Sequence, residues 1–181
     1  MARPPVTVVF GARNVGRAIA MERLAAGGRV LAVARSRETI DSLRVALPDV
    51  VAVRGDATDE EDVADVLARA GRDLGGVDLV VNATTAPPRD HGFGGGPILD
   101  APAERLDAWM AGFVPAAWTI LRAGGAALAR HGGGTLVQVA GGSARRAIPR
   151  RGPWGAPQHP APAPTPAPAP APRPPGGRRG P

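Results

Sequence analysis

Residues Val6–Ala20 read VTVVFGARNVGRAIA, and this stretch decides the fold class of the chain. A run of β-branched residues ends at Gly11, and an amphipathic segment begins directly after the turn. A nucleotide-binding strand–turn–helix unit begins in this way, because Gly11 and Gly16 let the backbone turn tightly and approach a phosphate. The helix that follows would present N–H groups and the positive end of its dipole to that phosphate. The stretch therefore predicts a dinucleotide site.

Strand-like and helix-like segments alternate along the first 152 residues. Short Val- and Leu-rich runs, typical of strands covered on both faces, predict the strands Val6–Phe10, Val30–Ala34, Val50–Arg54, Val77–Asn82 and Thr135–Val139. The segments between them predict the helices Asn14–Ala26, Arg37–Leu47, Asp59–Leu74 and Ala103–Arg130. Such alternation predicts an α/β fold: a Rossmann-like, doubly wound parallel sheet of order 3-2-1-4-5, with its ligand at the carboxyl ends of the strands.

The third predicted helix has the clearest local signals. Thr58 or Asp59 is its N-cap, and Glu60, Glu61 and Asp62 lie in its first turn, where the helix dipole favours acids. Its predicted apolar face is formed by residues at helical spacing, namely Val63, Val66, Leu67 and Ala70.

Composition divides the chain into two parts. Twelve of the 21 prolines lie after residue 152, so we expect residues 1–152 to form the Rossmann-like dinucleotide-binding domain and residues 153–181 to form a disordered Pro/Ala-rich tail. The formal net charge of +6 is also divided, since 19 arginines face 16 acids in the first part and three arginines lie in the second. A charge of +3 spread over a domain is typical of a solvated surface and disfavours nucleic-acid binding.

Several other classes of protein are disfavoured by composition. The chain has no cysteine, which excludes disulfides and thiolate metal sites and favours a reducing compartment. No apolar run approaches the roughly 20 residues of a membrane span, and the N-terminus lacks the apolar segment of a signal peptide. We therefore expect a cytoplasmic protein with no metal site and no membrane partner. The sequence does not decide the oligomeric state, and a homo-oligomer is one of the states it allows.

Four segments resemble, in this order, motifs of the short-chain dehydrogenase/reductase family. They are GARNVGRAIA in the first turn, GDATDEEDV after the third strand, LVVNAT in the fourth strand and GGGTLVQVAGGSA around the fifth. The first is one residue short, with two of the family's three glycines. The resemblance covers about Val6 to Gln158. It implies that a nicotinamide dinucleotide and a small carbonyl or alcohol substrate exchange a hydride.

The resemblance also implies which residues contact the cofactor. Asp56 would be the hydrogen-bond partner of the adenine. The complete expected set is Gly11, Arg13, Asn14, Val15 and Gly16 in the first turn, Arg35 after the second strand, Asp56 and Ala57 after the third, and Asn82, Ala83 and Thr84 at the end of the fourth.

The end of the second strand, VARSR, favours NADP over NAD. An acid at this point would accept hydrogen bonds from the ribose 2′-hydroxyl of NAD, and none is present. Arg35, helped by Arg37 and by Arg13, would instead pair with a 2′-phosphate, because the guanidinium fork donates two parallel hydrogen bonds. The other interpretation is that these arginines are solvent-exposed at a helix start, and we favour that interpretation for Arg37.

The family's proton-transfer residues have no counterpart in the chain. The resemblance places Gly141 at the serine position, Trp154 at the tyrosine position and Gln158 at the lysine position, with the asparagine position near Phe113. Tyrosine and lysine are absent from the whole sequence. Indole N–H does not ionise in the useful range, and glutamine carries no charge that could shift the pKa of a neighbour. We therefore predict no catalytic residue and weak or absent activity.

Three side chains are the nearest substitutes for the missing groups. Ser143 lies two residues past the serine position, although a turn serine more often hydrogen-bonds its own backbone. His131 follows a long predicted helix, where we expect it to cap the helix. His91 lies in the glycine-rich loop Pro87–Pro97, which either lines the site or is a plain surface connection.

The prolines at 157, 160 and 162 are incompatible with the family's long helix after the fifth strand. That strand would then lie at the edge of a C-terminally incomplete sheet, so we interpret the sequence as a truncated or frame-shifted reductase. Two other functions stay open. One is a non-catalytic nucleotide-binding or regulatory module, and the other is an interaction protein that acts through its proline-rich tail.

Overall fold

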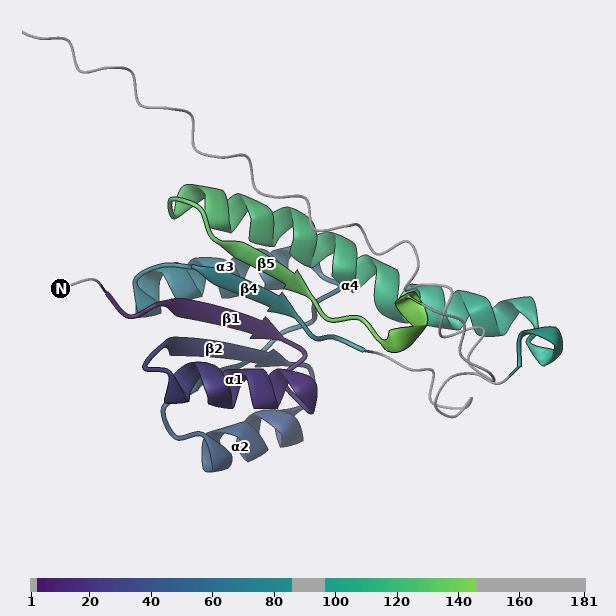
Figure 1. Ribbon diagram of the computed structural model, residues 1–181, viewed down its shortest axis with the longest axis horizontal. Coiled ribbons are helices and arrows are strands. Elements are labelled where there is room, and N and C mark those ends of the chain that lie inside the picture. The colour runs from purple at the N-terminus through teal and green to yellow at the C-terminus, as the bar shows by residue number, and fades with distance from the viewer. Residues whose placement is uncertain (1–2, 86–96, 146–181) are drawn as a thin grey trace, which may run out of the picture.

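The computed structural model describes residues 3–85 and 97–145. They form a parallel sheet with helices on both faces (Figure 1). The strands are β1 Val6–Phe10, β2 Arg29–Ala34, β3 Val51–Arg54, β4 Leu79–Asn82 and β5 Thr135–Gln138. The helices are α1 Val15–Ala25, α2 Arg37–Ala46, α3 Glu60–Leu74 and α4 Ala103–Arg130, with short 3-10 turns η1 Ile98–Asp100 and η2 Gly142–Ala144.

The strand order is β3-β2-β1-β4-β5, and each neighbouring pair is parallel. This confirms the predicted doubly wound, Rossmann-like sheet. The order reverses beside β1, because the chain adds β2 and β3 on one side of it and β4 and β5 on the other. A ligand site is expected next to such a reversal, at the carboxyl ends of the strands.

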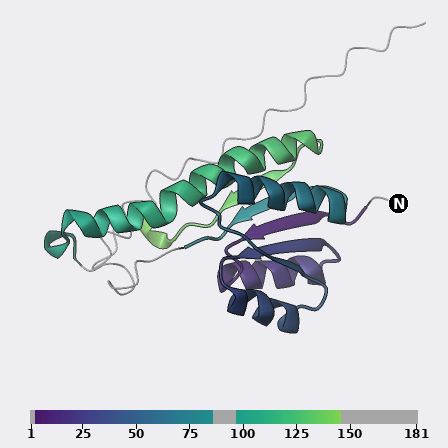
Figure 2. The same ribbon diagram turned by 180° about the vertical axis from the view of Figure 1, so that it is seen from behind.

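The two faces of the sheet bury separate apolar layers, because successive side chains of a strand point to opposite faces. Val8 and Phe10 pack with α3 and α4, whereas Val9 packs with α1 and α2. The predicted apolar face of α3 is buried as Val63, Val66, Leu67 and Ala70. Figures 1 and 2 show α4 extending beyond the carboxyl ends of the strands.

The N-terminus of α3 follows the predicted capping chemistry. Of the two candidates, Thr58 and Asp59, the structure selects Asp59. Its Oδ1 accepts the backbone N–H groups of Glu61 and Asp62 at 2.8 and 3.0 Å. Acids also fill the first turn of α3, where the helix dipole favours negative charge.

β5 lies at one edge of the described sheet, as predicted, and its side chains alternate between exposed and half-buried. Val137 on this strand is 39% exposed. The predicted domain boundary after residue 152, the tail and the residues Trp154 and Gln158 lie outside the described residues, as does His91. Within the described ranges, no helix combines the length and apolar character needed to cross a membrane.

Arg3 and Asp78 tie the segment before β1 to the turn before β4. Arg3 Nη1 and Nη2 donate to the two carboxylate oxygens of Asp78 at 2.7 and 2.8 Å, and Oδ2 also accepts the N–H of Val6 at 2.7 Å. The hydrogen bond from Arg3 lowers the pKa of Asp78. Partial burial opposes this effect, and the Val6 N–H and the charges of Arg3 and His131 add to it. The pKa of Asp78 therefore lies below its ordinary value.

We expect Asp78→Asn to lower the free energy of unfolding at neutral pH and to lose this effect in acid. The folded-state pKa is lowered from the unfolded value of about 3.9. The ionised carboxylate therefore stabilises the fold above about pH 4, and this stabilisation disappears as the pH falls through the folded-state pKa. Denaturant unfolding of both proteins over a pH series measures the difference. A deficit of the same size in acid would contradict the assignment.

Candidate functional site

The turns after β1, β2, β3 and β4 lie along one edge of the sheet, because the strands are parallel. All of the residues predicted to contact a cofactor are on these turns, on the strand end at Asn82 or in the first turn of α1. The edge is built from four segments that are far apart in the sequence.

The turn between β1 and α1 is closed by backbone hydrogen bonds and by a glycine with positive φ. The N–H groups of Gly11 and Ala12 both donate to the carbonyl of Val33 in β2 at 3.0 Å. Gly11 has φ +81°, and a Cβ added there would lie 2.5 Å from the carbonyl oxygen of Ala83 and 2.6 Å from the nitrogen of Thr84. Glycine is therefore required at position 11 by the turn after β4 as well as by the backbone conformation.

Gly16 lets α1 begin directly against this turn. A Cβ at Gly16 would lie 2.5 Å from the carbonyl oxygen of Gly11 and 3.2 Å from Cγ1 of Val9. Both glycines are thus required by contacts within the protein itself. Sequence reasoning explained them by the approach of a phosphate and missed this packing role.

The N-terminus of α1 has no side-chain cap. Asn14 is its N-cap residue and makes no capping hydrogen bond, and the first turn contains no acid. The N-terminus of α4, at Pro102, also lacks a side-chain cap, whereas Ser36 Oγ accepts the Thr39 N–H at the start of α2, and Asp59 caps α3. The first N–H groups of α1 are therefore not capped by the side chain of Asn14, and they can meet an anion at the site.

The turn after β3 fixes the carboxylate of Asp56. Its Oδ1 accepts the backbone N–H of Thr58 at 2.9 Å and the Thr58 hydroxyl at 2.8 Å. Partial burial raises the pKa of Asp56, but the two hydrogen bonds from Thr58 and the positive charge of Arg35 lower it. The net effect is a pKa below the ordinary value, so Asp56 is ionised at neutral pH.

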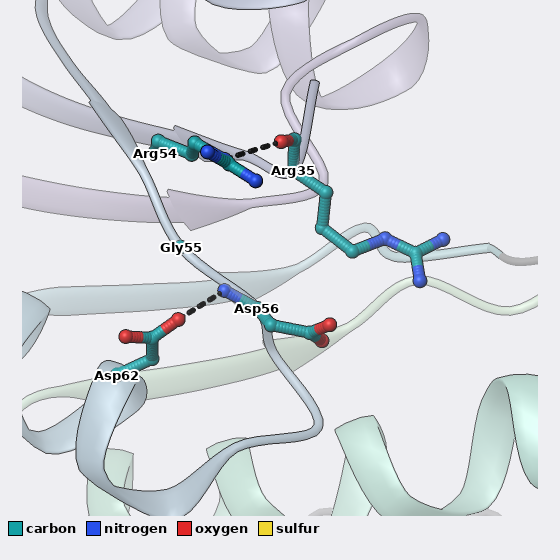
Figure 3. A pocket seen from close by; sticks show the side chains of 5 residues that line it. All are labelled: Arg35, Arg54, Gly55, Asp56 and Asp62. Carbon is teal, nitrogen blue, oxygen red and sulfur yellow. Dashed lines mark hydrogen bonds between the residues drawn. The ribbon is translucent and has the colours of Figure 1, made fainter. Parts of the chain in front are cut away.

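A cavity of about 310 Å³ lies where β2 and β3 end (Figure 3). Its lining residues are Arg35, Arg54, Gly55, Asp56 and Asp62. Arg54 Nε donates to the carbonyl oxygen of Arg35 at 3.1 Å, and the N–H of Asp56 donates to Asp62 Oδ2 at 2.8 Å. The cavity therefore brings together two residues predicted from the sequence, Arg35 and Asp56.

Sequence reasoning missed Arg54 and Asp62 as lining residues. Arg54 is the last residue of β3 and pairs in register with Ala34, the residue before Arg35. Because the strand order was predicted, this register was the signal that could have placed Arg54 beside Arg35. Asp62 lies in the first turn of α3, and sequence reasoning assigned it only to the helix dipole.

Asn82, at the end of β4, is 1% exposed, and its side-chain amide is occupied within the protein. Nδ2 donates to Gln138 Oε1 at 2.8 Å, and Oδ1 accepts the N–H and the hydroxyl of Thr84 at 3.0 and 2.6 Å. Asn82 therefore joins β4 to β5 and shapes the turn that meets Gly11. In this arrangement its side chain positions the turn at the site edge.

Ser143 in η2 is 3% exposed, and among the described residues its Oγ has no hydrogen-bond partner. The interpretation that this hydroxyl bonds its own backbone is therefore wrong, and the 3-10 turn is closed instead by the backbone N–H groups of Ala144 and Arg145, which donate to the carbonyls of Gly141 and Gly142. Phe113, near the expected asparagine position, is buried in α4. His131 is the C-cap residue of α4, and its backbone N–H donates to the carbonyls of Ala127 and Leu128. The expected interaction of its imidazole with the helix dipole stays a prediction. Among the described residues, no group of three His, Asp or Glu side chains could hold a metal ion.

The sheet order, the glycine turn and the uncapped helix behind it define a Rossmann-like domain of the dinucleotide-binding class. Comparison with known proteins gives the family. The family model described as Enoyl-(Acyl carrier protein) reductase matches residues 9–159, which is most of the chain. The chain therefore belongs to the short-chain dehydrogenase/reductase family, whose members are NAD(P)-dependent oxidoreductases.

Individual relatives are similar to the chain over part of their length. Farnesol dehydrogenase of Aedes aegypti is 36% identical over 83 residues, which are 42% of this chain and 34% of that protein. The structure of a short-chain dehydrogenase from Streptomyces avermitilis has a TM-score of 0.71 and 26% identity, covering 86% of this chain and 56% of the other. NAD+-bound xylitol dehydrogenase has a TM-score of 0.76 at 21% identity, over 87% and 60%, which shows the shared fold. The chain thus spans 34 to 60% of these relatives.

Proposed function

We propose that this chain binds NADP(H) at the carboxyl edge of its sheet and is a short-chain dehydrogenase/reductase-type domain with weak or absent turnover. The observation that carries the proposal is the cavity at the ends of β2 and β3, where Arg35 lies beside the ionised Asp56. A cation and a fixed carboxylate in one cavity suit the phosphorylated adenosine of NADP, which presents both an anion and hydrogen-bond donors.

The residues of the edge fit the different parts of such a cofactor. The N-terminus of α1, behind the turn from Gly11 to Gly16, would hold the pyrophosphate. Asp56 and Ala57 would hold the adenine, and Arg35, helped by Arg13 from the first turn, would hold the 2′-phosphate. The turn from Asn82 through Ala83 to Thr84 would lie on the nicotinamide side, beyond the reversal of strand order. When bound, the cofactor supplies the hydride of the family reaction.

Weak turnover follows from the absence of a proton donor. Reduction of a carbonyl requires a proton at the oxygen as the hydride arrives, and a positioned acid contributes about 10²–10⁴-fold to the rate. The sequence contains no tyrosine and no lysine, and the family resemblance places Gly141 at the serine position. The buried Ser143 hydroxyl could donate a hydrogen bond, but a serine hydroxyl is a poor general acid at neutral pH.

We expect the purified chain to bind NADPH without carbonyl-dependent oxidation of it. A fluorescence titration with NADPH should saturate, whereas NADPH absorbance should not fall above background when aldehydes and ketones are added. Turnover of any carbonyl at a rate typical of enzymes, about 1 per second or more, would contradict the predicted loss of proton transfer. Failure of NADPH to bind would contradict the proposal as a whole.

A non-catalytic nucleotide-binding module is the second candidate, and the same missing residues favour it. The two candidates differ in whether any hydride reaches a substrate. Mass spectrometry of a long incubation with deuterated NADPH and mixed carbonyls distinguishes them: deuterated alcohol supports residual reductase activity, and its absence supports a purely binding role.

A further inference from the structure

We propose that Arg54 is a second specificity-determining arginine, which acts with Arg35 to select a 2′-phosphorylated adenosine. This inference rests on the proposed function, because it concerns the same cavity. The strands β2 and β3 are paired, with Ala34 opposite Arg54, so Arg35 and Arg54 both lie at the carboxyl ends of neighbouring strands, and both line the same cavity. Figure 3 shows the Arg54 guanidinium beside the Arg35 backbone, whereas the Arg35 side chain extends away from it, toward the side where the Asp56 carboxylate lies.

One hydrogen bond fixes Arg54 without consuming its terminal donors. Nε donates to the carbonyl oxygen of Arg35 at 3.1 Å, and this contact links the Arg54 side chain to the segment that carries Arg35. The terminal nitrogens of Arg54 make no hydrogen bond within the described part of the chain. Because guanidinium is planar, an anchored Nε also orients these nitrogens, which are the pair that matches a phosphate.

The carboxylates of the cavity do not neutralise these two arginines by direct ion pairs. Asp56 Oδ1 accepts both hydrogen bonds from Thr58, and Asp62 Oδ2 accepts the N–H of Asp56. Over residues 3–85 and 97–145, neither Arg35 nor Arg54 forms a salt bridge, whereas Arg3, Arg37, Arg44, Arg69 and Arg122 do. Both arginines of the cavity are therefore available to an incoming anion.

Two cations that line one cavity favour a ligand group with more than one negative charge. A phosphate monoester carries about −1.5 to −2 at neutral pH, so two guanidinium groups can share it. A ribose 2′-hydroxyl carries no charge, so a second arginine does not add to its binding affinity. The arrangement thus predicts that Arg54 contributes to the affinity for the 2′-phosphate and leaves the affinity for the unphosphorylated ribose unchanged.

The test uses two fragments that differ only in the 2′-phosphate, adenosine 2′,5′-bisphosphate and adenosine 5′-monophosphate, titrated calorimetrically into the full chain. We expect the wild type to prefer the bisphosphate. Arg54→Met should weaken bisphosphate binding by about tenfold or more, the usual size of a charge-assisted hydrogen bond, and change monophosphate binding by less than about twofold. The bisphosphate affinity of Arg54→Lys should lie between those of the wild type and Arg54→Met, because lysine keeps the charge but lacks Nε and the planar guanidinium fork.

Arg44→Met is the matched control. Arg44 Nη2 also donates to a strand carbonyl, that of Ala52 at 3.1 Å, but Arg44 does not line the cavity. This variant should bind both fragments like the wild type. Thermal unfolding of all variants identifies any loss of folding, and the Arg54→Lys result carries the test if Arg54→Met unfolds.

The outcomes separate the inference from the proposed function. If the wild type prefers the bisphosphate and the Arg54 variants keep this preference, the inference fails and the function stands. Equal weakening of both fragments also overturns the inference, since it indicates a purely structural role. If the wild type binds the two fragments equally, selection of the 2′-phosphate fails while nucleotide binding stands. If it binds neither fragment nor NADPH, both proposals fail.

Discussion

Gly11→Ala is expected to lower the free energy of unfolding by roughly 2–5 kcal/mol and to abolish nucleotide binding. The left-handed backbone conformation costs a residue with a Cβ about 1–2 kcal/mol, and overpacking against a rigid neighbour adds about 1–3 kcal/mol. The neighbour here is backbone, because the new Cβ would lie 2.5 Å from the Ala83 carbonyl oxygen. Relief of this contact would require the turns after β1 and β4 to separate, and both border the proposed site.

Gly27→Ala is the matched control for this prediction. Gly27 has φ +77°, close to the +81° of Gly11, but a Cβ there has no atom within 4 Å. Gly27→Ala should therefore lower the free energy of unfolding by only about 1–2 kcal/mol, which is the cost of the left-handed backbone conformation. Denaturant unfolding of the two variants isolates the contribution of the contact between the turns. Equal losses of stability would show that the close approach of Ala83 to Gly11 does not constrain the fold.

Arg35→Ala is expected to weaken NADPH binding by about 10- to 100-fold, while NADH binding changes by less than about threefold. Hydrogen bonds from a guanidinium to a phosphate contribute about 1.5–3 kcal/mol when both groups are charged. NADH lacks the 2′-phosphate, so it loses only the general attraction of the cation. Fluorescence titration of each cofactor measures the ratio. An equal effect on both cofactors would contradict the assignment of Arg35 to the 2′-phosphate.

Arg37→Ala serves as the control, because Arg37 lies only two residues away and carries the same charge. Its side chain is 92% exposed, and its Nε lies 3.8 Å from Asp41 Oδ2 one turn further along α2. Exposed pairs of this kind contribute little to stability. We expect both cofactors to bind this variant as they bind the wild type, in agreement with the interpretation of Arg37 as a solvent-exposed arginine.

The fold could be predicted from the sequence because its local signals agree with one another. The Val-rich runs, the glycine turn after Phe10 and the acids that begin α3 each indicate the same alternation of strands and helices. Parallel strands then need crossover helices, and this requirement leaves few strand orders. The observed order β3-β2-β1-β4-β5 and the bounds of α4 match the prediction.

Side-chain contacts of the site were less predictable, because they depend on how separate turns meet. The closeness of Gly11 to Ala83 follows from the pairing of β1 with β4 and has no local signature in the sequence. The same is true of Arg54, whose position beside Arg35 depends on the register of β2 and β3. The amide pair between Asn82 and Gln138 likewise requires a contact across two strands. Sequence motifs identified the turns, and only the assembled sheet shows what each side chain contacts.

Hydrogen–deuterium exchange with and without NADPH determines whether the carboxyl edge of the sheet is the cofactor site. We expect slower exchange on NADPH addition at the amides of residues 11–17, 54–58 and 82–85, because these segments form the turn, the cavity and the neighbouring edge. Residues 47–50 and 75–78, at the opposite edge, should be unaffected. Protection confined to that opposite edge, or no change anywhere at millimolar NADPH, would contradict the account.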